Sequence, residues 1–388
     1  MRTISLSLLL LLWTPMASAA TFCVETATEL QNALDTAASN GESDIIRVAV
    51  GTYEAPAGGF ALNAQTLTDF DQDIVIRGGF SEFFGNPCGN EGFFQTTDTV
   101  LSSDSGNILS IELPGAGDIT VLNLSFVGAE AQSSGGGLRV TRSAGTYSGK
   151  LRIENNAFIA NRSNSLGGGL YIGKGGSNDP IEGTSSTAIL VVNNLFSGNV
   201  GGSCCGALYA FVDAPPPPPP VLSTLPALVV AHNTVSNNSA QVGGSYRAIS
   251  LRGDIQNTWV VSNNIWGLDA TADIQLVLLQ SETIVVRNNN IQDINVGSIN
   301  VADVYLDNIR VTPQYVSCGV GCFDLVPVTG SPLTNAGWAP AGGLPFFSPA
   351  WQPPEFDLTG TDRVKDGRID IGVYEGIADT MFADRFEN

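Results

Sequence analysis

The chain has 388 residues, 43% of them hydrophobic, so it can form a large core and is neither a disordered chain nor a miniprotein held by disulfides alone. Its 17 Lys and Arg residues against 37 Asp and Glu give a net charge of -20, which disfavours nucleic acid and anionic membrane surfaces as partners. Only 14% of the residues are charged, whereas 44 are Gly and 20 are Pro, and this composition favours turn-rich β structure over helices.

Residues 1–20 have the pattern of a secretory signal peptide. Arg2 precedes an apolar run at 6–13, and small residues follow at 17–20. The run is too short to span a bilayer, and no later stretch has enough consecutive apolar residues for a transmembrane helix. We therefore expect an exported protein without a transmembrane span, located outside the cell or on the outer-membrane surface.

An amphipathic helix is predicted within residues 21–44. Thr26 and Glu29 have the spacing of a capping box, and Leu30, Ala33 and Leu34 fall on one helical face. We expect this helix to cover the N-terminal end of the domain that follows, because an uncovered end would expose unpaired strand edges.

A repeated β-branched run that ends in an asparagine turn dominates residues 45–330. Copies occur at 151–158, 190–196, 229–235, 260–266 and 285–291, with a weaker copy at 119–126. The spacing predicts a right-handed parallel β-helix, the pectin-lyase-like solenoid, in which equivalent asparagines stack. The predicted ladder is Asn156, Asn194, Asn233, Asn264 and Asn289.

His232, the only histidine, aligns with the first asparagine of the other turns, namely Asn155, Asn193, Asn263 and Asn288. A lone histidine could act as a general base. Its place in the repeat instead predicts a member of the stack, because imidazole can both donate and accept a hydrogen bond.

Glycine-rich corners follow the asparagine turns, as in 166–171 and 205–209. Together with Phe158-Ile-Ala-Asn161 and Phe196-Ser-Gly-Asn199, they resemble the repeats of the chlamydial polymorphic outer-membrane protein family. Tyr171 and Tyr209 end two of these corners, and we predict that their rings stack on a carbohydrate ligand. A Pro-rich segment at 213–226 is predicted to be a loop between coils.

The C-terminal region at 331–376 carries two further motifs. Ser331-Pro-Leu-Thr-Asn-Ala-Gly337 and Asp366-Gly-Arg-Ile-Asp-Ile-Gly-Val-Tyr-Glu375 resemble the signatures of the choice-of-anchor Q domain found in β-helix proteins of gammaproteobacteria. Val373 and Asn335 depart mildly from those signatures. The resemblance implies a surface-exposed β-helix protein, with residues 377–388 as a short tail that resembles the endings of other exported proteins.

Six cysteines in an exported chain are expected to form disulfides. We predict that Cys23 pairs with Cys88 and Cys318 with Cys322, although spacing alone does not choose among the possible pairings. For the adjacent Cys204 and Cys205 the sequence does not decide between a vicinal disulfide and two free thiols.

Calcium is the one cofactor that the sequence suggests. Asp69, Asp71 and Asp73 alternate, so an extended backbone would turn their carboxylates to one side. A second acidic group, Asp362, Asp366 and Asp370, surrounds a glycine-containing turn. Acidic turns without an ion are the alternative, since the whole chain is acidic.

Enzymatic chemistry is the competing interpretation of the fold. The paired-carboxylate motifs of galacturonan hydrolases are missing, and Arg252, Asp254, Asp273 and Arg287 look like isolated solvated residues. The sequence therefore favours a protein that binds a polysaccharide or a cell-envelope component, in the manner of an adhesin, without cleaving it. A polysaccharide lyase or glycoside hydrolase is the alternative.

Overall fold

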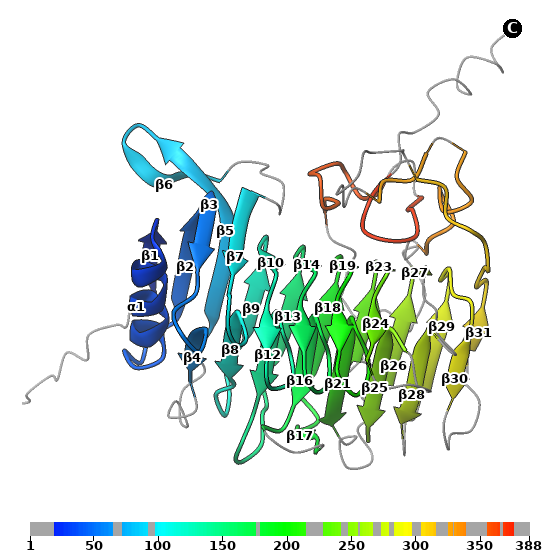
Figure 1. Cartoon of the computed structure of the whole chain (residues 1–388), viewed down its shortest axis with the longest axis horizontal. Helices are drawn as coiled ribbons and strands as arrows, with labels where there is room; N and C mark the ends of the chain where they lie inside the picture. Colours follow the sequence, from blue (N-terminus) through cyan, green and yellow to red (C-terminus); the bar gives the residue numbers. More distant parts are fainter. Residues whose placement is uncertain are drawn as a thin grey trace, which may run out of the picture.

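A computed structural model describes residues 19–64, 72–91, 98–175, 179–214, 228–241, 247–254, 257–266, 273–278, 283–296, 304–315, 325–328, 330–338, 355–364 and 368–375. In these segments the chain forms a parallel β-helix with one α-helix at its N-terminal end (Figure 1). The fold expected from the asparagine turns is confirmed.

Each coil contributes strands to up to four sheets, and equivalent strands of successive coils pair in parallel. Sheet A consists of β1 (Ala20–Val24), β2 (Asp44–Ala49), β5 (Ile74–Phe83), β9 (Ile119–Leu122), β13 (Lys150–Glu154), β18 (Ala188–Val192), β22 (Leu228–Ala231), β26 (Asn257–Val261), β29 (Thr283–Arg287) and β31 (Val304–Leu306), with β6 (Asn86–Glu91) paired to β5. Sheet B consists of β3 (Gly51–Glu54), β7 (Thr99–Ser102), β10 (Ser125–Val127), β14 (Ala157–Ile159), β19 (Leu195–Ser197), β23 (Thr234–Ser236) and β27 (Asn264–Trp266).

The other two sheets close the coil. Sheet D is short, with β11 (Glu130–Ala131), β15 (Arg162–Ser163), β20 (Val200–Gly201) and β24 (Ser239–Ala240). Sheet C consists of β4 (Phe60–Asn63), β8 (Leu109–Glu112), β12 (Leu138–Thr141), β16 (Leu170–Gly173), β21 (Leu208–Asp213), β25 (Ile249–Gly253), β28 (Ile274–Leu278) and β30 (Ile294–Val296), with β17 (Ile181–Glu182) paired to β21.

The turn from sheet A to sheet B is made by one residue in the left-handed conformation. Asparagine tolerates this conformation best among residues with a side chain, which explains why it recurs. The residues at this position have φ between 52° and 57°, and they are Asn123, Asn155, Asn193, His232, Ser262, Asn288 and Asp307. His232 therefore lies in the predicted column, but its equivalent in the next coil is Ser262 and not Asn263.

The next residue in each coil forms a buried amide ladder. Each amide nitrogen donates to the side-chain oxygen of its counterpart one coil further along, at 2.9–3.2 Å. The ladder consists of Asn156, Asn194, Asn233, Asn263, Asn289 and Asn308. The prediction was wrong for Asn264, which lies one residue later in β27, because Ser262 occupies the turn and shifts the asparagine pair by one.

A second ladder lies at the turn from sheet B to sheet D and was not predicted. The Asn161 amide donates to Asn199 at 3.0 Å, and the Asn199 amide donates to Asn238 at 2.8 Å. All three side chains are buried. Inside the coils, Phe126, Phe158 and Phe196 stack with ring centroids 4.8–4.9 Å apart, which is the spacing of neighbouring strands.

The helix α1 (Ala27–Ala37) covers the first coils, as expected. Thr26 accepts a hydrogen bond from the Glu29 amide, and the Glu29 carboxylate accepts one from Thr26, so the predicted capping box is present. Leu30 and Leu34 are buried in the core. The helix is shorter than the predicted segment, because strand β1 precedes it and pairs with β2.

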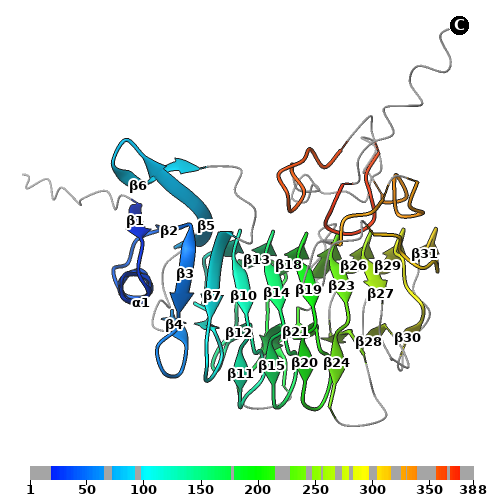
Figure 2. The ribbon, with the colours of Figure 1, turned by 45° about the horizontal axis from the view of Figure 1, so that its top comes forward.

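The C-terminal segments within 325–375 pack against one flank of the β-helix (Figure 2). Trp338 packs on the outer face of sheet A, and Leu358, Val373 and Tyr374 pack beside sheet B. This contact explains why β18, β22 and β26 are buried on both faces, whereas β9 alternates between buried and partly exposed residues.

Candidate functional site

The outer face of sheet C carries polar and aromatic side chains at equivalent positions of successive strands. Its register places Arg139, Tyr171 and Tyr209 in one column, followed by Ser250 and Gln275. Phe211 and Arg252 are paired in the neighbouring column. Because parallel strands lie about 4.8 Å apart, these side chains form a continuous strip across the coils.

Three arginines in or beside this strip form no ion pair within the part of the chain that the structure describes. Among the described residues, no carboxylate lies within 4.0 Å of Arg139, Arg247 or Arg252. Arg252 donates to the Tyr209 hydroxyl at 3.3 Å and lies 5.5 Å from the centre of the Phe211 ring, while Arg247 donates to the Gln275 side chain. Burial and the charge of Arg252 both lower the pKa of Arg247. Two like charges are thus held near each other, with no carboxylate paired to either of them in the described segments.

The two tyrosines predicted to bind carbohydrate are brought together, but they are not accessible. Their rings stack at 5.6 Å, yet Tyr171 is only 2% exposed and Tyr209 only 1%. Tyr171 donates to the Lys174 carbonyl, and burial raises its pKa to about 12. The prediction that these rings stack on a sugar is therefore wrong, because both rings are buried within the strip, whose other side chains are buried or half-buried.

Two carboxyl groups lie at one end of the strip. Asp213 ends β21, Asp254 directly follows β25, and the Asp254 amide donates to the Asp213 carboxylate at 2.7 Å. Burial raises the pKa of Asp213, and the nearby charges of Asp254 and Glu182 raise it further. Arg252 and Asp254, which look isolated in the sequence, thus share one face with Asp213.

The other two residues expected to be solvated have structural roles. Asp273 is buried and accepts hydrogen bonds from the Gln292 and Asp293 amides, and burial raises its pKa to about 6. Arg287 pairs with Asp307 at 2.9 Å and lies 4.6 Å from the Trp338 ring centre.

His232 does not have the surroundings of a general base. The side chain is completely buried where the C-terminal segments cover the β-helix. Burial and the positive charge of Arg363 both lower its pKa well below the usual range. The imidazole is therefore neutral and out of reach of substrate.

The predicted calcium site is only partly within the described residues. Asp69 and Asp71 lie outside them, and Asp73 accepts a hydrogen bond from the Asp118 amide of the next coil at 2.9 Å. In the second acidic group, Asp366 lies outside the described residues and Asp370 accepts the Asn335 amide. No group of metal-ligating side chains is found in the described segments, so calcium binding stays a prediction.

The disulfide between Cys23 and Cys88 is confirmed and ties β1 to β6. Cys204 and Cys205 form a vicinal disulfide, which settles the question that the sequence left open. Cys205 has φ of 63°, at the corner where the preceding coils have Gly135 and Gly167. Cys318 and Cys322 lie outside the described residues.

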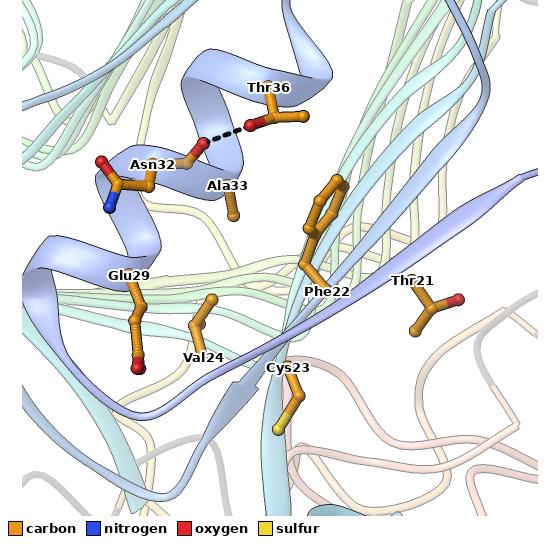
Figure 3. A pocket seen from close by; sticks show the side chains of 8 residues that line it. All are labelled: Thr21, Phe22, Cys23, Val24, Glu29, Asn32, Ala33 and Thr36. Carbon is orange, nitrogen blue, oxygen red and sulfur yellow. Dashed lines mark hydrogen bonds between the residues drawn. The ribbon is translucent and has the colours of Figure 1, made fainter. Parts of the chain in front are cut away.

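A separate pocket of about 370 Å³ lies between β1 and α1 (Figure 3). Thr21, Phe22, Asn32 and Thr36 are among its lining residues. Glu29 is the one ionisable group in the lining, and its carboxylate caps the helix. This pocket therefore has no pair of groups suited to acid–base chemistry.

The C-terminal signatures form a network of their own. The Asn335 amide donates to Asp370, and the Gly337 amide donates to the Ile369 carbonyl, which joins the two motifs. Arg363 is completely buried and lies 3.1 Å from Glu375. The residues that suggest the choice-of-anchor Q resemblance are thus mostly structural in this chain.

This network should make stability depend on pH. Burial raises the pKa of Glu375 to about 8, against the attraction of Arg363 and with a further increase from Asp370 and Asp357. The folded state then binds the proton more tightly than the unfolded state, so stability present at about pH 4.5 is lost as the pH rises towards 8. The free energy of unfolding should fall by at most about 1.4 kcal/mol per pH unit from this one group.

Urea unfolding of the wild type and the Glu375→Gln variant at several pH values between 5 and about 9 checks this expectation. The variant should lose the Glu375 part of the pH dependence, because glutamine does not titrate. Parallel pH profiles for the two proteins would contradict it.

No protein-family model matches the chain, and no curated protein matches it. Among the described residues, no helix has the length and apolar character needed to cross a membrane.

Proposed function

We propose that this is an exported β-helix protein that binds an acidic polysaccharide on the outer face of sheet C without cleaving it. In this proposal the protein belongs with the choice-of-anchor Q and polymorphic outer-membrane β-helix proteins and acts in an adhesin-like way outside the cell or on its outer surface. The signal-peptide pattern at 1–20 and the C-terminal motifs support the location.

The observation that carries the binding proposal is a pair of arginines, Arg247 and Arg252, with which no described carboxylate forms an ion pair. Both side chains are half-buried, Arg252 within β25 and Arg247 two residues before this strand, in a chain whose net charge is -20. A planar guanidinium can bind a sugar carboxylate through two parallel hydrogen bonds. Phe211, also half-buried beside Arg252, offers an apolar surface to the sugar ring.

We propose binding without cleavage because the side chains that could act as a general base are buried. His232 and Tyr209 are buried, and burial shifts each pKa in the direction that favours the neutral form. Because both side chains are buried, neither reaches a substrate on the surface.

A second candidate function is supported by the two carboxyl groups at the end of the strip. Burial raises the pKa of Asp213, which favours a proton donor there, and a second carboxyl group beside it matches the paired carboxyl groups of glycoside hydrolases. A hydrolase or lyase of the pectin-lyase-like fold is therefore the alternative.

Binding of polygalacturonate and of a neutral glucan, measured by calorimetry, tests the proposal. Arg252→Gln and Arg247→Gln should each weaken polygalacturonate binding about tenfold, which corresponds to loss of one charge-assisted hydrogen bond. Arg152→Gln is the matched control, because Arg152 lies on sheet A and already pairs with Glu154. The neutral glucan should not bind.

The same preparations are assayed for new reducing ends and for unsaturated products. We expect no cleavage by the wild type. Cleavage that Asp213→Asn abolishes would instead support the hydrolase alternative, and unchanged affinity in both arginine variants would show that sheet C is not the binding face.

A further inference from the structure

The hairpin of β5 and β6 departs from the parallel pattern of the β-helix. The end of β5 leaves the coil and pairs antiparallel with β6, and Phe83 is paired with Asn86 across a two-residue turn. Figure 1 shows this hairpin rising from the body near the N-terminal end.

The turn carries a residue that the backbone does not favour. Phe84 has φ of 49° and Gly85 has φ of 79°, so both turn residues are left-handed, as in a type I′ turn. Asn-Gly and Asp-Gly are the usual sequences for such a turn, and a bulky residue in this conformation costs about 1 kcal/mol or more. The stability of the turn therefore does not explain why residue 84 is a phenylalanine.

The tip of the hairpin, residues 83–86, carries two exposed aromatic side chains, and the base of the hairpin is fixed to the β-helix. Phe83 is 53% exposed and Phe84 is 93% exposed, and their rings lie edge to face with centroids 4.4 Å apart. At the base of the hairpin, the disulfide between Cys23 and Cys88 fixes β6 to β1. Phe80 is buried there beneath Arg47 and Arg77, whose guanidinium carbons lie 5.3 and 5.9 Å from its ring centre.

We propose that this tip inserts into the interface of a phospholipid bilayer with zwitterionic headgroups. A projecting pair of aromatic rings on a supported hairpin suits the boundary between headgroups and acyl chains, where aromatic residues are favoured. Residues 81–91 contain Glu82 and Glu91 but no Lys or Arg, and the arginines at the base, Arg47 and Arg77, lie over the Phe80 ring, so the tip itself offers anionic lipids no positive charge.

The orientation of the molecule agrees with this proposal. The hairpin and the C-terminal segments rise on the same side of the β-helix in both views (Figures 1 and 2). Insertion of the tip places that flank towards the bilayer and leaves sheet C, on another side of the coil, available to a polysaccharide.

Vesicle flotation with phosphatidylcholine, with and without phosphatidylglycerol, tests the proposal on the full chain. The wild type should bind the zwitterionic vesicles, and added anionic lipid should weaken binding. Phe84→Asn should reduce the vesicle partition coefficient about tenfold or more, because it removes a phenyl ring from the apolar phase. The same change should preserve or raise the melting temperature, since asparagine suits the turn.

Tyr305→Ser is the matched control, because Tyr305 is 50% exposed in β31 at the other end of the β-helix. It should leave vesicle binding unchanged. The proposal is overturned if the wild type does not bind vesicles, or if Phe84→Asn binds as well as the wild type. Capture of a protein partner that depends on Phe84, without vesicle binding, would assign the tip to a protein pocket instead.

Discussion

Replacing Asn233 with leucine is expected to destabilise the β-helix by at least about 3 kcal/mol, since several buried polar groups lose their partners at about 1–3 kcal/mol each. The Asn233 side-chain oxygen accepts from the Asn194 backbone and side-chain amides at 2.9 and 3.1 Å. Its amide nitrogen donates to the Val191 carbonyl and to Asn263, both at 2.9 Å. Leucine replaces none of these four bonds, and urea unfolding followed by circular dichroism measures the loss.

Asn295→Leu provides the matched control, because Asn295 lies on a strand, β30, with its side chain exposed. This change should alter the free energy of unfolding by less than about 0.5 kcal/mol. Asn199→Leu, in the second ladder, should cost about as much as Asn233→Leu. Similar unfolding midpoints for Asn233→Leu and Asn295→Leu would show that the ladder does not hold the coils together.

The coil repeat could be predicted because each turn is decided by local chemistry. The left-handed residue and the ladder amide are adjacent, so an Asn-Asn pair indicates both at once. The same pairing caused the error at Asn264. There Ser262 takes the left-handed position, so the pair Asn263 and Asn264 begins at the ladder position, and sequence alone does not separate the two registers.

The contacts between segments far apart in the sequence could not be predicted from local chemistry. The strands β18, β22 and β26 are apolar on both faces, and that pattern indicates a second covering layer outside the coil. It does not say which segment provides the layer. The docking includes backbone hydrogen bonds, because the amides of Gly372 and Trp338 both donate to Ser262.

The candidate site depends on register across sheet C, which variable loops conceal. The distance along the chain between equivalent residues changes from coil to coil, as in the pairs Tyr171 with Tyr209 and Ser250 with Gln275. For this reason the closeness of Arg252 to Tyr209 and of Asp254 to Asp213 could not be derived by counting residues. The burial of the two tyrosines was also hidden, because neighbouring corner residues such as Cys205 pack on them.

Replacing Arg363 with leucine is expected to release the C-terminal segments from the β-helix. The guanidinium is fully buried beside Glu375, and the carboxylates of Asp357 and Asp370 add to the attraction. Removing the guanidinium leaves the carboxyl groups around it without a positive charge, and breaking a buried ion pair in this way typically costs about 3–5 kcal/mol when the carboxyl group is ionised, which for Glu375 is above about pH 8.

Hydrogen exchange read separately in the two parts of the molecule measures this release. In Arg363→Leu, amides at 355–364 and 368–375 should lose protection, while ladder amides such as Asn194 and Asn233 keep theirs, because the coil interior makes its own bonds. The double variant Arg363→Leu with Glu375→Leu should recover part of the protection, since an apolar pair can replace a buried ionic one. If Arg363→Leu keeps full protection at 368–375, the buried arginine is not what holds these segments on the flank. If the ladder amides lose protection at the same time, the C-terminal segments are part of one cooperative unit with the coils instead of a layer added to them.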